Sequence, residues 1–126
     1  MNVVGIGMDI IEIERMERAL RRTPRIAERC FTRAERDYCR ARGRAAVHFA
    51  GRFAAKEAIA KAVGRPLVWQ EVEVGRSERG RPVVSLSGGT REALAGRRLL
   101  VSITHTEHYA AACALLLGGS VEEETA

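Results

Sequence analysis

The chain has 126 residues, of which 46% are hydrophobic, 5% aromatic and 29% charged. This length suits one domain with its own core; the charged fraction excludes a membrane-embedded protein, and the apolar fraction excludes a disordered chain. The formal net charge of +5 favours anionic partners such as nucleic acid, phosphates or an acidic protein.

The N-terminal segment is predicted to form a strand followed by a helix. Residues 3–7 are rich in β-branched side chains, which predicts the strand. Gly5 and Gly7 within it indicate close backbone packing, because GxG without a third glycine does not make a dinucleotide-binding motif. A helix is predicted over 12–22, and the Pro24 that follows breaks it.

Two further helices are predicted before the middle of the chain. Thr32 followed by Glu35 has the spacing of a capping box, which predicts a helix over roughly 33–42. The strongest helical signal runs over 44–63, where good helix formers dominate and Gly64 ends the pattern.

The second half is predicted to be mostly strands, and helices followed by strands indicate an α+β fold. The expected elements are strands near 68–74 and 82–86, a short helix around 90–95, and closing strands at 99–104 and 109–117. We expect a single domain over residues 1–118 and a frayed acidic tail at 119–126.

The cysteines and the N-terminus indicate a cytoplasmic protein. Cys30, Cys39 and Cys113 are odd in number and show no CxxC spacing, so a disulfide framework or zinc site is not expected. The apolar N-terminus has no basic region typical of a signal peptide, and no apolar run approaches the ~20 residues of a membrane helix.

Positive charge is concentrated in the helical half. Residues 1–66 carry fifteen basic and eight acidic groups, a net of +7, and residues 67–126 carry six and eight, a net of −2. Five arginines step by three and four residues: Arg15, Arg18, Arg22, Arg25 and Arg29. They form either an ordinary solvated face or a docking surface for an anionic partner; aromatic residues for stacking on nucleic acid are nearly absent there.

The long predicted helix carries unusual charges. Glu57 and Lys61 share one face with Phe49 and Phe53. They form either an exposed pair worth roughly a few tenths of a kcal/mol or a site in apolar surroundings, where a carboxylate needs a cation or metal as partner. Among 21 basic residues, Lys56 and Lys61 are the only lysines, which suggests a requirement for a compact ammonium group.

Two further residues are candidates for chemistry. Asp9 ends an apolar strand, where it is either a helix N-cap or, with Glu57, one of two carboxylates that hold Mg²⁺. His105 follows a predicted strand and is either structural or placed to contact phosphate or move a proton.

Three segments together resemble the holo-acyl-carrier-protein synthase family, the small phosphopantetheinyl transferases. They are GIGMDIIEIER at 5–15, GRFAAKEAIAKAVG at 51–64 and VSITHTEHYAAA at 101–112. Their order, their spacing and the total length fit that family over essentially the whole chain.

The resemblance implies an α+β domain in which one long central helix packs on a small, mostly antiparallel sheet. It implies Mg²⁺-dependent transfer of 4′-phosphopantetheine from coenzyme A to a serine of an acidic apo acyl carrier protein or carrier domain, with release of adenosine 3′,5′-bisphosphate. It also implies a homotrimer with active sites at subunit interfaces, and neither nucleic acid nor membrane as partner. The alternative is a basic nucleic-acid-binding module without catalytic activity.

The resemblance also assigns site residues. Metal binding falls on Asp9 and Glu57, and the catalytic set is completed by Lys61 and His105. Contacts with coenzyme A fall on Arg52, Lys56, Lys61, Gly64 and His105, where His105 either contacts phosphate or transfers a proton. Carrier docking falls on Arg15, Arg22 and Arg25.

Overall fold

A 19-residue helix, α4 (Ala45–Val63), runs through the middle of the molecule and is buried on most of its surface. The computed structural model describes residues 2–119, so the predicted acidic tail lies outside the described residues from position 120 onward. The other elements are β1 (Val3–Glu12), α1 (Ile13–Arg22), α2 (Arg25–Cys30), α3 (Arg33–Arg40), the 3₁₀ turn η1 (Trp69–Glu71), β2 (Val72–Arg76), β3 (Pro82–Leu86), α5 (Gly88–Ala93), β4 (Arg98–His105) and β5 (Tyr109–Leu117).

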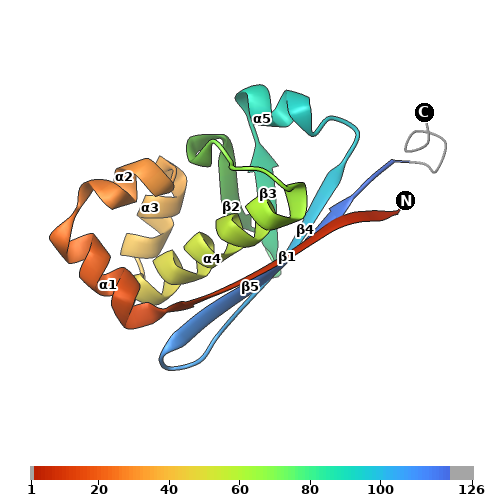
Figure 1. Cartoon of the computed structure of the whole chain (residues 1–126). Coiled ribbons are helices and arrows are strands. Elements are labelled where there is room, and N and C mark those ends of the chain that lie inside the picture. The colour runs from red at the N-terminus through yellow and green to blue at the C-terminus, as the bar shows by residue number, and fades with distance from the viewer. Residues whose placement is uncertain (1, 120–126) are drawn as a thin grey trace.

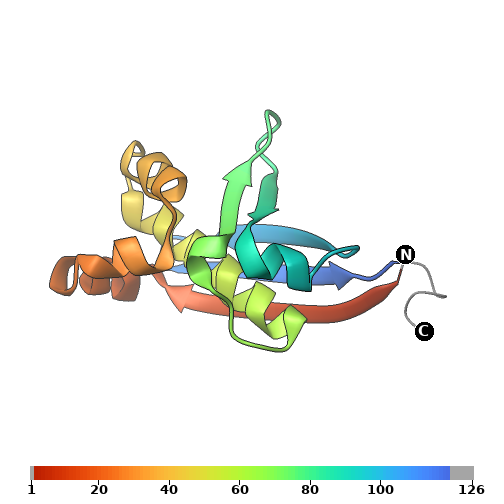
Figure 2. The same ribbon diagram turned by 90° about the horizontal axis from the view of Figure 1, so that it is seen from above.

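A three-stranded antiparallel sheet in the order β1-β5-β4 packs one face against α4, and β2 and β3 form a separate hairpin (Figures 1 and 2). The central strand β5 alternates buried Ala110, Ala112, Ala114 and Leu116 with half-buried residues. Alanine takes little space, so the sheet can lie close to the helix. This arrangement confirms the predicted α+β fold with a long central helix.

The edge strand β1 lies directly on the backbone of α4. A methyl group at Gly7 would overlap the carbonyl oxygen of Ala58, and one at Gly5 would overlap that of Ala62. The prediction that these glycines permit close backbone packing is confirmed.

The other face of the sheet is apolar and exposed. Ile6, Met8 and Ile10 of β1 are 63%, 65% and 65% exposed. They stand opposite Leu115, Cys113 and Ala111 of β5. Within residues 2–119, no helix or strand covers this face, which we call the outer sheet face and define by these six residues.

The helices α1, α2 and α3 gather at one end of α4 and enclose a second core (Figure 1). Phe31 and Phe49 meet edge to face at its centre, with ring centroids 4.9 Å apart. The capping box at Thr32 and Glu35 is present as predicted. The helix α2 was not predicted, because Pro24 was interpreted only as a break; proline also favours a helix start, and Pro24 is the N-cap of α2.

The predicted and observed elements differ at two further places. β1 runs to Glu12, five residues beyond the predicted strand. The predicted strand over 68–74 is wrong in its first half, where η1 forms instead. The Glu71 side chain accepts hydrogen bonds from the backbone N–H groups of Gly89 and Thr90, and this distant contact fixes the start of α5.

No helix within residues 2–119 combines the length and apolar character needed to cross a bilayer.

We predict that Gly7→Ala destabilises the protein, because the new methyl group must push β1 away from the carbonyl of Ala58. Overpacking of this kind costs about 1–3 kcal/mol or more. Thermal midpoints at matched protein concentration measure the effect. Gly43→Ala is the control, because nothing lies within 4 Å of the added atom; equal midpoints for the two variants would contradict the close contact.

Candidate active site

Three of the predicted site residues lie together where β1 crosses α4. The Lys61 ammonium donates to the carbonyl oxygen of Met8 at 3.0 Å and lies 3.4 Å from Oδ1 of Asp9. Glu57 precedes Lys61 by one helical turn and therefore shares its face of α4. β1 and α4 thus bring two carboxylates and one ammonium group into the same region.

The surroundings of this group combine partial burial with an opening to solvent. The Asp9 side chain is 19% exposed and that of Lys61 is 56% exposed. Glu57 and Lys61 line a shallow pocket of about 340 Å³ together with Gly64, Arg65 and Trp69. A phosphate group entering this pocket would meet two cationic side chains.

Two of the simpler interpretations of these residues are wrong. Asp9 does not cap the first helix, because β1 continues to Glu12 and Glu12 is the N-cap of α1. Lys61 forms its ion pair with Asp9 of the adjacent strand β1 and not with Glu57 of its own helix.

Lys56 is fully buried, although the resemblance assigned it to a coenzyme A phosphate. Its ammonium lies 2.6 Å from Oε1 of Glu35 and donates to the carbonyl oxygens of Cys30 at 2.8 Å and Trp69 at 3.1 Å. Burial lowers the pKa of Lys56, and the Glu35 carboxylate opposes that shift. A direct contact between Lys56 and a phosphate does not fit this burial and these three acceptors.

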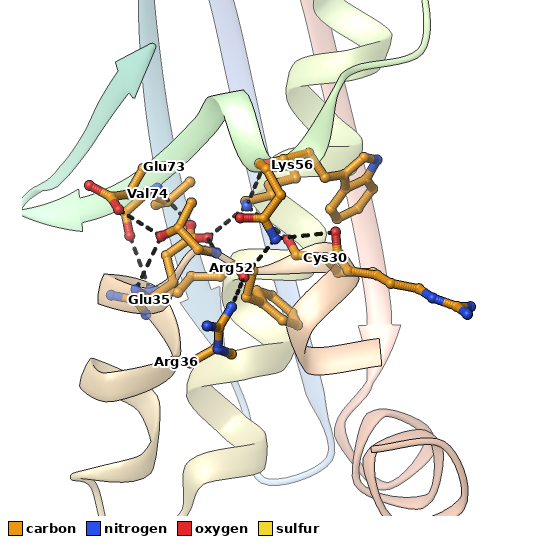
Figure 3. A network of polar contacts seen from close by, with 12 residues as sticks. Cys30, Glu35, Arg36, Arg52, Lys56, Glu73 and Val74 are labelled. Atoms are coloured by element: carbon orange, nitrogen blue, oxygen red, sulfur yellow. Dashed lines mark hydrogen bonds and ion pairs between the residues drawn. The ribbon is translucent and has the colours of Figure 1, made fainter. Parts of the chain in front are cut away.

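Glu35 is equally buried and completes the network (Figure 3). Its Oε1 also accepts the backbone N–H of Thr32 at 2.8 Å, and its Oε2 accepts that of Val74 at 2.7 Å. Removing one partner of such a pair costs about 3–5 kcal/mol, because it leaves a buried charge without compensation. The capping-box spacing pointed to Glu35, but nothing in the sequence indicated its ion pair.

Arg52 is also buried, with 4% of its surface exposed. Its Nε donates to the carbonyl oxygen of Val74 at 3.1 Å, and its guanidinium lies 4.2 Å from the centre of the Tyr38 ring. Arg42 at 3.6 Å and Arg76 at 5.7 Å approach the same ring. Arg52 therefore contributes to a cationic cluster around Tyr38, while its own side chain has little contact with solvent.

Two histidines on this side of the molecule lie next to the cationic cluster. His48 packs its ring edge to face on Tyr38, with centroids 5.8 Å apart. Its pKa is lowered by burial first, and then by the positive charges of Arg52, Arg76 and Arg42 and by His105. His105 is exposed at the end of β4.

The cationic cluster and the carboxylate group occupy different sides of α4. His48 precedes Glu57 by nine residues, about two and a half turns, which places the two on opposite faces of the helix. His105 lies near His48. Within one chain it is therefore separated from the region of Asp9, Glu57 and Lys61.

The predicted carrier-docking arginines are all exposed at the helical end. Arg15 lies on α1, Arg22 ends α1 and Arg25 begins α2. In the described part of the chain, none of the three is within ion-pair distance of a carboxylate. Their charges remain available to an acidic partner.

The donor set at Asp9 and Glu57 fits a hard divalent cation that brings other ligands with it. The described residues contain no cluster of three or more His, Cys, Asp or Glu side chains suited to a metal. Mg²⁺ is usually held by one or two carboxylates together with waters and substrate phosphates. Glu57, which lines the pocket, and Asp9, whose partner Lys61 lines it, match this pattern.

A larger groove, which sequence reasoning missed, lies between β3 and β4. Its volume is about 710 Å³, and it is lined by apolar strand residues together with Arg81, Arg97 and Arg98. None of the predicted site residues lines it. No local sequence pattern indicates this groove, because it forms where strands of two separate sheets meet.

The chain belongs to the 4′-phosphopantetheinyl transferase superfamily, whose family model matches residues 5–114. It is 46% identical over 123 residues to a holo-[acyl-carrier-protein] synthase of Moorella thermoacetica, covering 93% of this chain and 96% of that protein. The sequence-based identification of the family is confirmed.

Solved structures agree with this assignment. A holo-(acyl-carrier-protein) synthase from Bacillus anthracis in complex with CoA (3′,5′-ADP) superposes with a TM-score of 0.79 at 34% identity, covering 93% of this chain and 98% of that one. The holo-ACP-synthase from Plasmodium yoelii superposes with a TM-score of 0.85 at 26% identity, covering 94% and 98%. The chain is therefore an enzyme of the phosphopantetheinyl transferase class.

Proposed function

We propose that this enzyme transfers 4′-phosphopantetheine from coenzyme A to a serine of an acyl carrier protein. The serine hydroxyl attacks the β-phosphorus of the pyrophosphate, the bond to the bridging oxygen breaks, and adenosine 3′,5′-bisphosphate leaves. The observation that carries the proposal is the meeting of Asp9, Glu57 and Lys61 at the crossing of β1 and α4. The relatives named for this activity and the coenzyme A complex of one of them support it.

The residues of this chain act by positioning and by neutralising charge. The Lys61 ammonium, already oriented by Asp9 and the Met8 carbonyl, would neutralise a phosphate oxygen in the adjoining pocket. Preorganised charges of this kind usually make the largest contribution to catalysis when negative charge develops in the transition state. The nucleophile comes from the carrier, so the chain needs no nucleophilic side chain.

Asp9 and Glu57 would hold Mg²⁺. When bound, Mg²⁺ neutralises the pyrophosphate charge and stabilises the leaving group. On this chain Glu57, which lines the pocket together with Lys61, is also a candidate for accepting the serine proton. His105 would act only if another subunit carried it to this region.

A homotrimer would supply that second subunit. The cationic cluster and the carboxylate group lie on different sides of α4, so a head-to-tail ring can bring the cluster of one subunit to the carboxylates of the next. The outer sheet face offers the apolar surface that such assembly needs, because large exposed patches mark interaction sites. We expect the assembled enzyme in the cytoplasm, where its three free thiols stay reduced.

The defining experiment mixes the protein with coenzyme A, Mg²⁺ and an apo carrier protein. Mass spectrometry then measures whether the carrier gains one phosphopantetheine group. No gain, together with salt-sensitive affinity for DNA or RNA in the absence of Mg²⁺, would instead support the basic nucleic-acid-binding module.

Replacing either carboxylate should strongly reduce turnover without unfolding the enzyme. We predict that Asp9→Asn and Glu57→Gln each lower kcat/KM by at least about a hundredfold, comparable to the loss of one preorganised charge-stabilising group. The decrease is measured at saturating Mg²⁺ by the mass-spectrometric assay. Wild-type turnover in either variant would remove that residue from the site.

Reversing a charge at the helical end should weaken carrier binding alone. We predict that Arg22→Glu raises the KM for the carrier protein and leaves the KM for coenzyme A unchanged, because Arg22 lies on the exposed helical end and away from the carboxylate group. The increase should shrink as salt screens the charges. An unchanged carrier KM would count against docking at this surface.

A charge on the outer sheet face should prevent assembly. We predict that Met8→Glu converts the trimer to monomer in light scattering, because its 65% exposed side chain lies at the centre of the apolar face. Val68→Glu is the matched control, since Val68 is 58% exposed but lies outside the sheet. A trimer that persists in Met8→Glu would exclude this face as the interface.

A further inference from the structure

The buried pair Glu35–Lys56 is connected to the wall of the active-site pocket. Lys56 adjoins Glu57 in the sequence, and its ammonium uses its three hydrogens on Glu35, the carbonyl of Cys30 and the carbonyl of Trp69. These acceptors belong to α3, to the end of α2 and to η1 respectively. One side chain of α4 thus holds three other segments at a single point (Figure 3).

Trp69 is the part of this network that reaches the pocket. It lines the pocket together with Glu57 and Lys61. Its ring lies against Phe53, with centroids 5.1 Å apart, and the Lys56 ammonium is 5.8 Å from its centre. The position of Trp69 is therefore set from inside the protein by Lys56.

The segment that carries Trp69 is held at its other end by the partner carboxylate. Oε2 of Glu35 accepts the N–H of Val74 at 2.7 Å, while Lys56 binds the carbonyl of Trp69. The two charged groups touch each other and together fix both ends of residues 69–74. Gln70 adds a contact from the same segment, donating to the carbonyl of Phe31 at 2.9 Å.

Stability alone does not explain a charge pair at this position. Well-packed apolar side chains of similar volume are often as stabilising as a buried ion pair or more so. What an ion pair adds is direction, because each hydrogen bond specifies where its partner atom must lie.

We propose that Glu35 and Lys56 are positioning residues that hold Trp69 and the 69–74 segment in place to receive coenzyme A. This inference rests on the proposed function. Neither residue touches the substrate; both act through the backbone of the pocket wall.

The test compares the wild type with Glu35→Gln/Lys56→Met, which removes both charges together and so leaves neither one buried alone. The control is Arg33→Gln/Asp37→Asn, an ion pair at 4.0 Å with side chains 89% and 72% exposed. The chain contains one tryptophan and two tyrosines, so fluorescence excited at the red edge, where tyrosine does not absorb, reports on Trp69 alone. Circular dichroism establishes that each variant is folded.

We expect the buried double variant to raise the KM for coenzyme A about tenfold or more, since a shift of ~1 Å far from the chemistry can cost a hundredfold in rate. The KM for the carrier should not change. The Trp69 emission should shift, and its response to added coenzyme A should weaken. The surface control should match the wild type in all of these measurements.

A folded double variant with wild-type KM for coenzyme A and wild-type emission would overturn the proposal. If the double variant does not fold, Glu35→Asp decides the question: it keeps the charge but shortens the side chain by one methylene, and an unchanged coenzyme KM would overturn the proposal equally. If the wild type transfers no phosphopantetheine, the proposed function fails. The emission comparison then still tests whether the pair positions Trp69.

Discussion

The close contact between β1 and α4 determines where the candidate site lies. Gly5 and Gly7 allow the strand to rest on the helix backbone at Ala58 and Ala62. Side chains two residues apart on a strand point to the same face, so Asp9 follows Gly7 toward α4 and reaches Lys61. A bulkier residue in the strand would lift the carboxylate away from the helix that carries its partners.

The buried ion pair between Glu35 and Lys56 connects the pocket wall to the same helix, α4. Glu35 and Lys56 are almost completely excluded from solvent, and their hydrogen bonds connect α4 with the α2–α3 segment and with the pocket wall. One set of internal contacts therefore connects α4 both to the end of α2 and to the pocket wall.

Short sequence patterns correctly predicted several features of the fold. The capping box, the long helix ended by Gly64 and the tight packing at Gly5 and Gly7 all agree with the structure. The presence of lysine only at positions 56 and 61 marked the correct helix, although only Lys61 reaches the surface there. Lys56 is instead fully buried.

Contacts between distant residues account for what the sequence did not predict. The ion pair joins residues 21 positions apart, and no spacing rule links a capping glutamate to a lysine of another helix. The start of the predicted strand at 68–74 became η1, where the Trp69 carbonyl accepts the Lys56 ammonium. The separation of His105 from Glu57 likewise depends on the tertiary structure, because the two residues lie on different sides of α4.

The proposed chemistry depends on Asp9 and Glu57 binding the same divalent ion. The most direct measurement is a titration of Mn²⁺, used as a paramagnetic substitute for Mg²⁺, into the protein with coenzyme A, followed by electron paramagnetic resonance. We expect one tightly bound ion per chain in the wild type and loss of that ion in both Asp9→Asn and Glu57→Gln. Wild-type affinity in either variant would contradict this expectation.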